Sequence, residues 1–515
     1  MLVKTFGSAV YGVDAVTITV EVNVTQGLHT FLVGLPDSAI KESIQRVESA
    51  IKSNGYYMPR TKVVINLAPA NIRKSGSAFD LPIALGILAA SEQLPEPAVL
   101  KNYMIMGELG LDGSILPIKG ALPIAIQAQK EHFKGIILPA HNAREAAIAG
   151  GLNILAFTHL QEAIRFFLDP AASPVSMIPD TTPALTPSSL FTEPDFSEVK
   201  GQESIKRALE ISAAGGHNAI LIGPPGAGKT MLAKRLPGIL PPLSLEEALE
   251  TTKIHSIAGK LPPDAALITR RPFRSPHHTI SGRALVGGGS HHPQPGEISL
   301  AHHGVLFLDE LPEFSRSVLE VMRQPMEDRK ITISRTRLSI EFPSAFILLA
   351  SMNPCPCGYH NHPEKECTCP PGSVSKYLNR ISGPLLDRID LHVEVIPVPY
   401  SQLSATGEEE TSLQIRQRVV AARTIQEQRY HEHTGIYCNA QMNNRLLKEV
   451  CRIDSAGERL LKSAMNSLHL SARAYERILK VSRTIADLAI SGSIRSEHLA
   501  EAIQYRSLDR ERWGW

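Results

Sequence analysis

The stretch that decides the fold runs from Asn218 to Thr230 and reads NAILIGPPGAGKT. Its first part, Ala219–Ile222, is a short apolar run typical of a buried strand, and a turn rich in glycine and proline follows it. The turn fits the pattern G-x-x-x-x-G-K-[ST], in which backbone N–H groups face phosphate oxygens, the lysine neutralises them and the hydroxyl ligates Mg²⁺. The residues predicted to bind ATP are Gly223, Pro224, Pro225, Gly226, Ala227, Gly228, Lys229 and Thr230.

Two further apolar runs, Val305–Leu308 and Phe346–Ala350, predict strands of the same sheet. Helical stretches separate these strands, which favours a parallel sheet with helices on both faces. Asp309 and Glu310 follow the first run, so we expect Asp309 to hold Mg²⁺ and Glu310 to polarise the attacking water. Asn353 follows the second run, where its amide could orient that water, although such an asparagine alone is more often a turn residue.

The organisation of the chain follows from its 515 residues, which at roughly 150 residues per domain suggest about three domains. Residues 173–194 are rich in proline, serine and threonine, as in an extended linker. Before them, residues 16–22 and 62–67 read as strands and residues 38–53 and 81–91 as helices. From about residue 414 onward the pattern is helical. The predicted fold is α/β multidomain: an α+β domain at 1–170, a linker at 171–194, a P-loop core with a parallel sheet at 195–400 and an α-helical lid at 401–515.

The charge balance is nearly even, with 53 Lys and Arg against 51 Asp and Glu. This excludes a protein that coats a polyanion with its whole surface, so any nucleic-acid contact must be local. The N-terminal residues lack the apolar block of a signal peptide, and no run of 18 or more apolar residues occurs. We therefore expect a cytoplasmic protein with no membrane contact.

Four of the six cysteines lie close together in the sequence, at Cys355, Cys357, Cys367 and Cys369. Four thiolates can complete a tetrahedral Zn²⁺ site, so the sequence predicts a structural zinc knuckle at 355–369. The C-x-C spacing is less usual than C-x₂-C, and unliganded surface thiols are the alternative. Cys438 and Cys451 are interpreted as packed side chains.

Three further segments of the sequence indicate which protein family the chain resembles. They read RPFRSPHHT at residues 271–279, ALVGGG at 284–289 and PGEISLAH at 295–302. Together with the phosphate loop and its partners, they resemble the AAA+ superfamily and, within it, the ComM/YifB family of magnesium-chelatase-like ATPases, over most of the chain. This resemblance implies a homo-oligomeric ring, expected to be a hexamer, with ATP and Mg²⁺ at each site.

The resemblance also assigns roles to single residues. Asn353 matches the sensor position after its strand, and Arg388 resembles the arginine finger that one subunit offers to its neighbour's γ-phosphate, with Arg380 as the fallback. Arg473 looks like the second sensor on a lid helix. For either arginine alone, a surface ion pair worth ~0–1 kcal/mol is the alternative.

A β-hairpin is predicted from the alternation of residues 329–334 and 338–342 around a basic tip. In related rings a hairpin at this position points into the central channel. Arg335 and Arg337 are therefore the predicted contacts to the DNA backbone, against the alternative of surface ion pairs.

Three histidine pairs, His277-His278, His291-His292 and His302-His303, suggest metal binding. Adjacent residues on an extended segment point to opposite sides and do not readily chelate one ion. We interpret them as loop and strand-edge histidines near the nucleotide.

The N-terminal domain resembles the Lon-protease-like domain, most visibly in residues 106–113 and 136–139. That chemistry needs a serine activated by a lysine. Alignment to the family motifs puts Ala78 at the nucleophile and Leu122 at the base, so we predict no protease, although a slip of one residue would place Ser77 at the nucleophile. Ring assembly or substrate contact remain as roles for this domain.

The leading functional prediction is an ATP-driven ring motor acting on branched or single-stranded DNA, a helicase-type enzyme. The family resemblance implies branch migration or unwinding in recombination or natural transformation. One alternative is the motor subunit of a chelatase that inserts metal into a porphyrin. The other is an ATP-switched scaffold that recruits recombination proteins without processive translocation.

Overall fold

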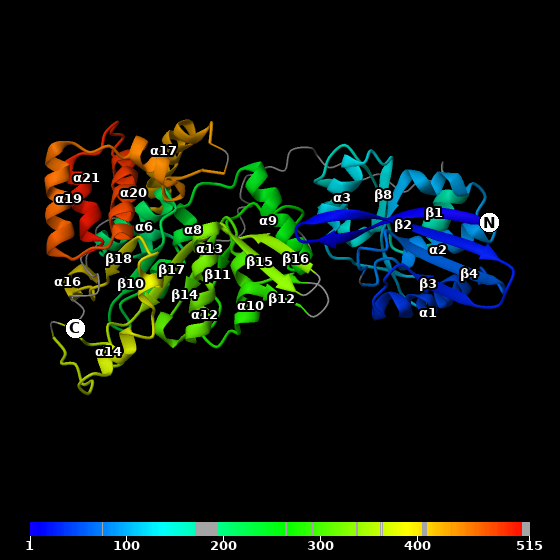
Figure 1. Cartoon of the computed structure of the whole chain (residues 1–515), viewed down its shortest axis with the longest axis horizontal. Helices are drawn as coiled ribbons and strands as arrows, with labels where there is room; N and C mark the ends of the chain where they lie inside the picture. The colour runs from blue at the N-terminus through cyan, green and yellow to red at the C-terminus, as the bar shows by residue number, and fades with distance from the viewer. Residues whose placement is uncertain are drawn as a thin grey trace.

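The computed structural model describes residues 1–74, 76–169, 194–262, 265–289, 293–335, 338–360, 362, 364–403, 409–433 and 435–506. Three parts follow one another along its longest axis, with the N-terminal sheet at one end, a second sheet in the middle and a group of helices at the other end (Figure 1). The predicted linker at 171–194 lies almost entirely outside the described residues. In the described part, no helix combines the length and apolarity needed to cross a membrane.

The N-terminal part is a mixed sheet of seven strands in the order β3-β4-β2-β1-β5-β8-β9. The long antiparallel pair β1 (Leu2–Tyr11) and β2 (Asp14–Thr25) lies at its centre, and α2 (Asp80–Ala90), which is buried along its whole length, packs on both strands. The expected strands at 16–22 and 62–67 are confirmed, and so are the helices at 38–53 and 81–91. The other elements are α1 (Ser38–Ser53), β3 (Thr30–Val33), β4 (Lys62–Ala68), β5 (Tyr103–Ile105), β6 (Glu108–Leu109), β7 (Ile115–Leu116), α3 (Ala121–Lys130), β8 (Gly135–Pro139), α4 (Ala143–Ala147), β9 (Asn153–Phe157) and α5 (Leu160–Leu168).

The central part is the predicted parallel sheet. Its five strands lie in the order β11-β14-β17-β10-β18, and each neighbouring pair is parallel. The strands are β10 (Ala219–Ile222), β11 (Phe273–Arg274), β14 (Val305–Leu308), β17 (Ile347–Met352) and β18 (Leu391–Glu394). Because side chains alternate along a strand, Ala219 and Leu221 belong to one apolar core while Ile220 and Ile222 belong to another on the opposite face. Burial on both faces explains why these strands read as continuous apolar runs.

Helices cover the two faces of this sheet. The helices before the cysteine segment are α6 (Glu203–Gly215), α7 (Lys229–Ala233), α8 (Leu236–Ile239), α9 (Leu245–Ala258), α10 (Gly282–Val286), α11 (Glu297–Leu300), α12 (Arg316–Val321) and α13 (Arg323–Asp328). Those after it are α14 (Ser373–Leu378), α15 (Gly383–Leu386) and α16 (Tyr400–Leu403), and a short pair of strands, β12 (Gly287–Gly288) and β13 (Gln294–Pro295), lies beside α10.

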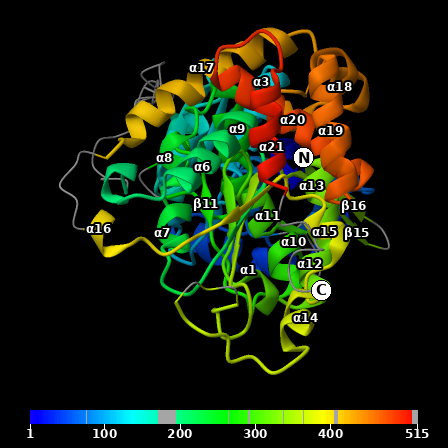
Figure 2. The ribbon, with the colours of Figure 1, turned by 90° about the vertical axis from the view of Figure 1, so that its left-hand side faces the viewer.

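The C-terminal part is helical throughout its described residues, as expected. It comprises α17 (Ser412–Tyr430), α18 (Asn444–Val450), α19 (Ser455–Ser467), α20 (Ala472–Leu488) and α21 (Ser496–Gln504). The helix α17 begins with a capping box, in which the side chains of Thr411 and Gln414 bond to each other's backbone N–H groups. The lid helices lie next to α6 (Figure 2), and their apolar residues share one continuous core with α6, α8 and one face of the parallel sheet.

The predicted hairpin is present as β15 (Lys330–Arg335) and β16 (Leu338–Pro343), which pair antiparallel. It lies on the side of the central part that faces the N-terminal sheet (Figure 1). A Cβ placed on Gly12, in the turn between β1 and β2, would lie 3.2 Å from Cγ2 of Ile340. The middle of β16 therefore lies against the N-terminal part.

A second contact joins these two parts through α3 and α9. Nζ of Lys253 lies 3.9 Å from Oδ1 of Asp14, and the Ser256 hydroxyl donates to Oε1 of Glu145. The junction thus combines these polar contacts with smaller apolar ones, in which Val13 and Ile148 pack on clusters of the central part, whereas the lid and the central sheet share one large apolar core.

Candidate functional site

The phosphate loop lies where the sequence places it, between the carboxyl end of β10 and the first residue of α7. Gly226 and Gly228 adopt φ values of 78° and 86°, which belong to the left-handed region that glycine enters without strain. Apart from its chain neighbours, no described residue has an atom within 4 Å of a Cβ built on Gly226, so the turn leaves open space there. This geometry suits a loop that surrounds phosphate oxygens with its N–H groups.

Lys229 is almost buried and is held by three oxygen atoms. Its Nζ donates to the carbonyl of Gly223 at 2.6 Å, to the carbonyl of Pro224 at 2.9 Å and to Oδ1 of Asn353 at 3.0 Å. Burial lowers the pKa of Lys229, and the charges of Asp309 and Glu310 oppose that shift. The structure therefore brings the loop lysine and the predicted sensor Asn353 together.

Asp309 connects the end of β14 to the phosphate loop. The Thr230 hydroxyl donates to Oδ2 of Asp309 at 2.8 Å, and the Ser351 hydroxyl donates to Oδ1 of the same carboxylate. A hydroxyl and a carboxylate oxygen facing each other are hard ligands of the type that Mg²⁺ prefers, so the donor set fits this ion. Ser351 was missed by sequence reasoning. Its signal was a buried hydroxyl in an otherwise apolar strand, two residues before Asn353 and therefore on the same side of β17.

Glu310 sits in the left-handed region with a φ of 54°, directly after Asp309. Its side chain is 58% exposed, and its Oε2 lies 3.8 Å from Nδ1 of His278. The His278 ring packs against the rings of His277 and Phe314, with centroids 4.0 Å and 6.4 Å apart. The interpretation of His277 and His278 as loop histidines near the nucleotide fits this arrangement, but sequence reasoning did not link His278 to Glu310.

Arg388 and Arg473 lie away from the phosphate loop of their own subunit. Arg388 precedes β18, and its backbone carbonyl accepts from Nδ2 of Asn218, the residue before β10, at 3.4 Å. Arg473 is exposed one helical turn before Arg477, whose Nη1 lies 3.1 Å from Oδ1 of Asp390 at the same sheet edge. Both arginines therefore lie near the amino ends of the strands, whereas the phosphate loop follows their carboxyl ends.

The two candidates for the arginine finger, Arg388 and Arg380, make different contacts within their own subunit. The Arg388 side chain is only 6% exposed, with Nη2 2.7 Å from Oε1 of Glu327 and Nη1 donating to the carbonyl of Pro384 at 2.6 Å. The fallback, Arg380, is 51% exposed and pairs with Glu313 at 2.9 Å, on the turn that follows Glu310. Arg380 is thus on the phosphate-loop side of its own subunit.

The four predicted zinc ligands come together. Their sulfur atoms all lie within 4.8 Å of one another, with Sγ–Sγ distances of 3.3 Å for Cys355–Cys357, 3.6 Å for Cys357–Cys367 and 3.8 Å for Cys355–Cys367. A tetrahedron with Zn–S bonds of about 2.3 Å has sulfur atoms about 3.8 Å apart, so the thiols fit a zinc ion. Backbone N–H groups of Cys357 and His360 donate to Cys369 and Cys355, as expected around thiolates. Cys438 and Cys451 are buried, in agreement with the sequence analysis.

The cysteine loop also touches the phosphate loop. A Cβ on Gly358, which has a φ of +85°, would lie 2.4 Å from Cδ of Pro225. This close approach means that the position of the cysteine loop and that of the phosphate loop depend on each other.

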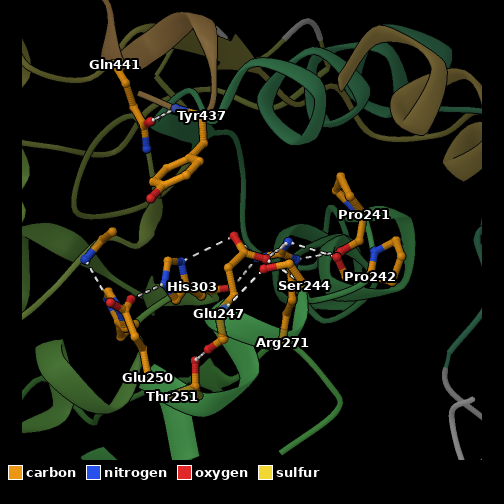
Figure 3. Close-up of polar contacts among 12 residues, drawn as sticks. Pro241, Pro242, Ser244, Glu247, Glu250, Thr251, Arg271, His303, Tyr437 and Gln441 are labelled. Carbon is orange, nitrogen blue, oxygen red and sulfur yellow. Dashed lines mark hydrogen bonds and ion pairs between the residues drawn. The ribbon is translucent and has the colours of Figure 1, made fainter. Parts of the chain in front are cut away.

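The pair His302-His303 forms a polar cluster with two glutamates of α9 (Figure 3). Nε2 of His302 and Nε2 of His303 lie 3.2 Å and 3.0 Å from Oε2 of Glu250, and Nδ1 of His303 lies 3.4 Å from Oε1 of Glu247. The N–H of Ala345 donates to Nδ1 of His302, which leaves the ring proton on Nε2, the atom that a metal would need. Both rings nevertheless face Glu250, contrary to the expectation that adjacent histidines point to opposite sides, and Glu250, His302 and His303 offer ligand atoms within 4.8 Å of one another, close enough to hold a metal ion. The pair His291-His292 lies outside the described residues.

The other predicted residues are the arginines at the tip of the hairpin and the N-terminal residues at the positions of the protease dyad. Arg335 ends β15, and Arg337 and the side chain of Arg335 lie outside the described residues. At the base of the hairpin, Lys330 pairs with Glu341 at 3.0 Å across the strands. In the N-terminal part, Leu122 is fully buried in α3, and the Ser77 hydroxyl donates to Glu108.

Comparisons with known proteins cover nearly the whole chain. The family model for magnesium chelatase subunit ChlI matches residues 195–403, that for its C-terminal part matches 409–506, and a further model for subunit ChlI of Mg-chelatase matches 20–142. The uncharacterized protein YifB of Escherichia coli is 46% identical over 98% of this chain and 96% of its own length. Competence protein ComM of Haemophilus influenzae is 43% identical over 98% of this chain and 97% of its own length. The 38 kDa subunit of magnesium-chelatase from Rhodobacter capsulatus is 27% identical over 31% of this chain and 50% of its own length.

Proposed function

The chain belongs to the family of magnesium chelatase subunit ChlI, and from this membership and the geometry of its phosphate loop we propose that it is an ATP-hydrolysing ring motor that acts on DNA. Family membership supports ATP and Mg²⁺ as its ligands. Hydrolysis, ring formation and the action on DNA are the proposal.

One observation carries the proposal of a ring. The groups that bind phosphate and Mg²⁺ meet at the carboxyl edge of the sheet, because Lys229 bonds to Asn353 and Thr230 bonds to Asp309. The two arginines that the family resemblance assigns to the transition state lie at the amino edge. A site built from both sets needs two copies of the chain, the second of which offers its amino edge to the phosphate loop of the first.

Each residue of the site has a chemical role in this proposal. Lys229 and the loop N–H groups hold the β- and γ-phosphates, and Thr230 and Asp309 would hold Mg²⁺, which neutralises charge on the phosphate oxygens when bound. Glu310 is exposed and close to His278, and it orients the attacking water together with Asn353. Arg388 of the neighbouring subunit stabilises the charge of the transition state, with Arg473 as the second sensor.

The proposed action on DNA is supported by the name of a similar protein and by the sequence of this chain. The relative from H. influenzae is named a competence protein, and it is 43% identical over nearly the whole chain. With the ComM/YifB resemblance and the basic tip at Arg335 and Arg337, this favours branch migration or helicase-type unwinding during recombination or natural transformation. A cytoplasmic location would keep the clustered thiols reduced.

The test is a branch-migration and strand-displacement assay on a Holliday junction, run at two salt concentrations because phosphate contacts weaken steeply with salt. We expect ATP-dependent displacement by the wild-type protein and none by Lys229→Ala, which should still form the ring. An Arg445→Ala variant, which changes an exposed arginine of α18, is the matched control and should retain activity. Absence of ATP-dependent strand displacement in the wild-type protein would refute the motor.

In addition to ATP and Mg²⁺, we propose that the chain binds a zinc ion through Cys355, Cys357, Cys367 and Cys369. The support is the near-tetrahedral spacing of the sulfur atoms. At this position zinc would fix the loop that packs on Pro225 and so hold the phosphate loop in place.

A chelatase motor is the second candidate function. It is favoured by the family models for subunit ChlI and by the relative from R. capsulatus. Stimulation of ATP turnover by DNA, and not by porphyrin-binding partners, distinguishes the DNA motor from it. The exposed Glu310 beside the metal site argues against a scaffold that binds ATP without hydrolysing it.

A further inference from the structure

A small cavity lies at the amino edge of the central sheet, between this sheet and the lid. Its lining includes Asn218, Gly304, Phe346 and Asp390, which precede β10, β14, β17 and β18. From the lid side, Tyr437 and Gln441 contribute, and Figure 3 shows them above the cluster of Glu247, Arg271 and His303. The cavity is therefore on the edge of the sheet opposite the phosphate loop.

Four arginines line this cavity, and they come from both sides of it. Arg271 and Arg329 belong to the central part, and Arg423 and Arg477 belong to α17 and α20 of the lid. Glu247 and Asp390 are the carboxylates among the lining residues, so the arginines outnumber them and leave two positive charges in excess.

Two of the arginines are paired. Nη2 of Arg271 lies 2.8 Å from Oε2 of Glu247, and Nη1 of Arg477 lies 3.1 Å from Oδ1 of Asp390. These two ion pairs use both carboxylates of the lining. The excess charge therefore belongs to the other two arginines.

The remaining arginines lack a counter-charge. Arg423 donates from Nη2 to the carbonyl of Ala213 at 3.1 Å, and its Nε is buried without a hydrogen-bond partner among the described residues. The guanidinium of Arg329 has no hydrogen bond or ion pair to any residue that the structure describes. Burial lowers the pKa of Arg329, and the charges of Arg477 and Arg423 lower it further, while Cys438 and Asp390 oppose the shift. A desolvated cation beside two others is unfavourable unless an anion joins them.

The volume of the cavity limits the size of the anion that it can hold. Its volume is about 80 Å³. This is roughly half of a ~150 Å³ cavity that admits benzene and well below the ~300 Å³ of sites for whole small molecules. A tetrahedral oxyanion fits such a volume, whereas a nucleoside does not. Arginine is also the side chain that best matches phosphate, because its fork of N–H donors bonds two oxygens at once.

We propose that this cavity is a second anion site, which binds a single phosphate group between Arg329 of the central part and Arg423 and Arg477 of the lid. The phosphate group would bridge the two parts and satisfy the donors of Arg329 and Arg423. It is distinct from the phosphate loop and goes beyond the proposed motor, since it requires neither hydrolysis nor DNA movement.

The test measures binding of inorganic phosphate while the phosphate loop is saturated with a non-hydrolysable ATP analogue and Mg²⁺, which also fill the γ-phosphate position, so that only another site can respond. We expect isothermal titration to show one further phosphate bound per chain. Arg329→Gln should weaken this binding by about tenfold or more, Arg329→Lys should weaken it less, and Arg459→Gln, on the exposed face of α19, should leave it unchanged.

A thermal measurement separates binding from folding. In phosphate-free buffer, Arg329→Gln should unfold at the temperature of the wild-type protein or above it, because a half-buried charge without a counter-charge is removed. Added phosphate should raise the unfolding temperature of the wild-type protein but not that of the variant. ADP affinity should be equal in both, which keeps this test independent of the proposed ATPase.

A third arm identifies the source of the phosphate. If DNA supplies it, a short single-stranded oligonucleotide should compete with inorganic phosphate, and Arg329→Gln should reduce the salt dependence of oligonucleotide binding by about one phosphate contact. If free phosphate is the ligand, the oligonucleotide should not compete. Either result supports the site. Equal phosphate binding by the wild-type protein and Arg329→Gln, or no binding beyond the phosphate loop, overturns it.

Discussion

Replacing Arg388 by alanine tests whether the proposed active site is shared between two subunits. If Arg388 stabilises the transition state of the neighbouring site, its loss should reduce ATP turnover by about 10³-fold or more. Binding of ADP should remain within about twofold of the wild-type value, because Arg388 lies at the edge of the sheet opposite its own phosphate loop.

The cost in stability can be worked from the contacts of the side chain. Arg388→Ala removes one charge-assisted hydrogen bond to the carbonyl of Pro384, worth about 1.5–3 kcal/mol. It also removes the ion pair to Glu327, whose side chain is 45% exposed and so adds only about 0–1 kcal/mol after solvent screening. A loss of about 1.5–4 kcal/mol from a typical 5–15 kcal/mol leaves most molecules folded. Unfolding therefore does not account for a loss of activity as large as 10³-fold.

The matched control is Glu327→Gln, which breaks the same ion pair and retains the arginine. It should lose less stability than Arg388→Ala and keep ATP turnover within about threefold of the wild-type rate, since no transition-state contact is removed. Mixing Lys229→Ala with Arg388→Ala subunits should restore part of the activity, because some interfaces then combine an intact lysine with an intact arginine. ATP turnover by Arg388→Ala within about tenfold of the wild-type rate would refute the assignment.

Three other perturbations test the surroundings of the site. Burial lowers the pKa of His302 to about 4 and that of His392 to about 3, both below the ordinary 6.5. The unfolded chain thus takes up protons first, and stability that is complete above pH 6.5 is lost as the pH falls toward 4. Urea titrations at about pH 7.5 and pH 5.5 should differ by about 1.3 kcal/mol for each histidine, and equal stability at the two pH values would contradict this. Protein purified without chelator should hold about one zinc per chain by elemental analysis, less in Cys367→Ser and an unchanged amount in the buried-thiol control Cys451→Ser; zinc-free wild-type protein would exclude the site. Gly358→Ala should weaken ADP binding several-fold because its Cβ would lie 2.4 Å from Pro225, whereas Gly372→Ala, at a φ of +77° with nothing within 4 Å, should not; equal affinities would show that the two loops are independent.

The sequence predicted the parts of the site that depend on local order. The run from Asn218 to Thr230 defines a strand, a turn and a helix start, and apolar runs that end in Asp309 and before Asn353 place both residues at one edge of a parallel sheet. These inferences need only strand direction and side-chain alternation. The structure has the corresponding contacts, from Lys229 to Asn353 and from Thr230 to Asp309.

Contacts between distant segments could not be predicted in this way. His278 reaches Glu310 through a loop whose path has no periodic pattern, and Ser351 was hidden within an apolar strand. The excess charge of Arg329 appears only when α17 and α20 bring Arg423 and Arg477 beside it. The sequence alone does not show which of its arginines come together in space, or which of these have no carboxylate to pair with.

The continuous core shared by the lid and the central sheet has a mechanical consequence. Residues such as Ile205, Leu221, Val419 and Ile478 pack in one apolar cluster, while the apolar clusters of the N-terminal sheet consist of residues from that part alone. Densely packed cores do not deform continuously, so bending within the first cluster would require breaking it. The lid and the central sheet therefore form a single rigid unit, and the softer joint of the molecule is its junction with the N-terminal sheet, where α3 meets α9 and Gly12 approaches Ile340, so motion of the rigid unit reaches the N-terminal sheet through these smaller contacts.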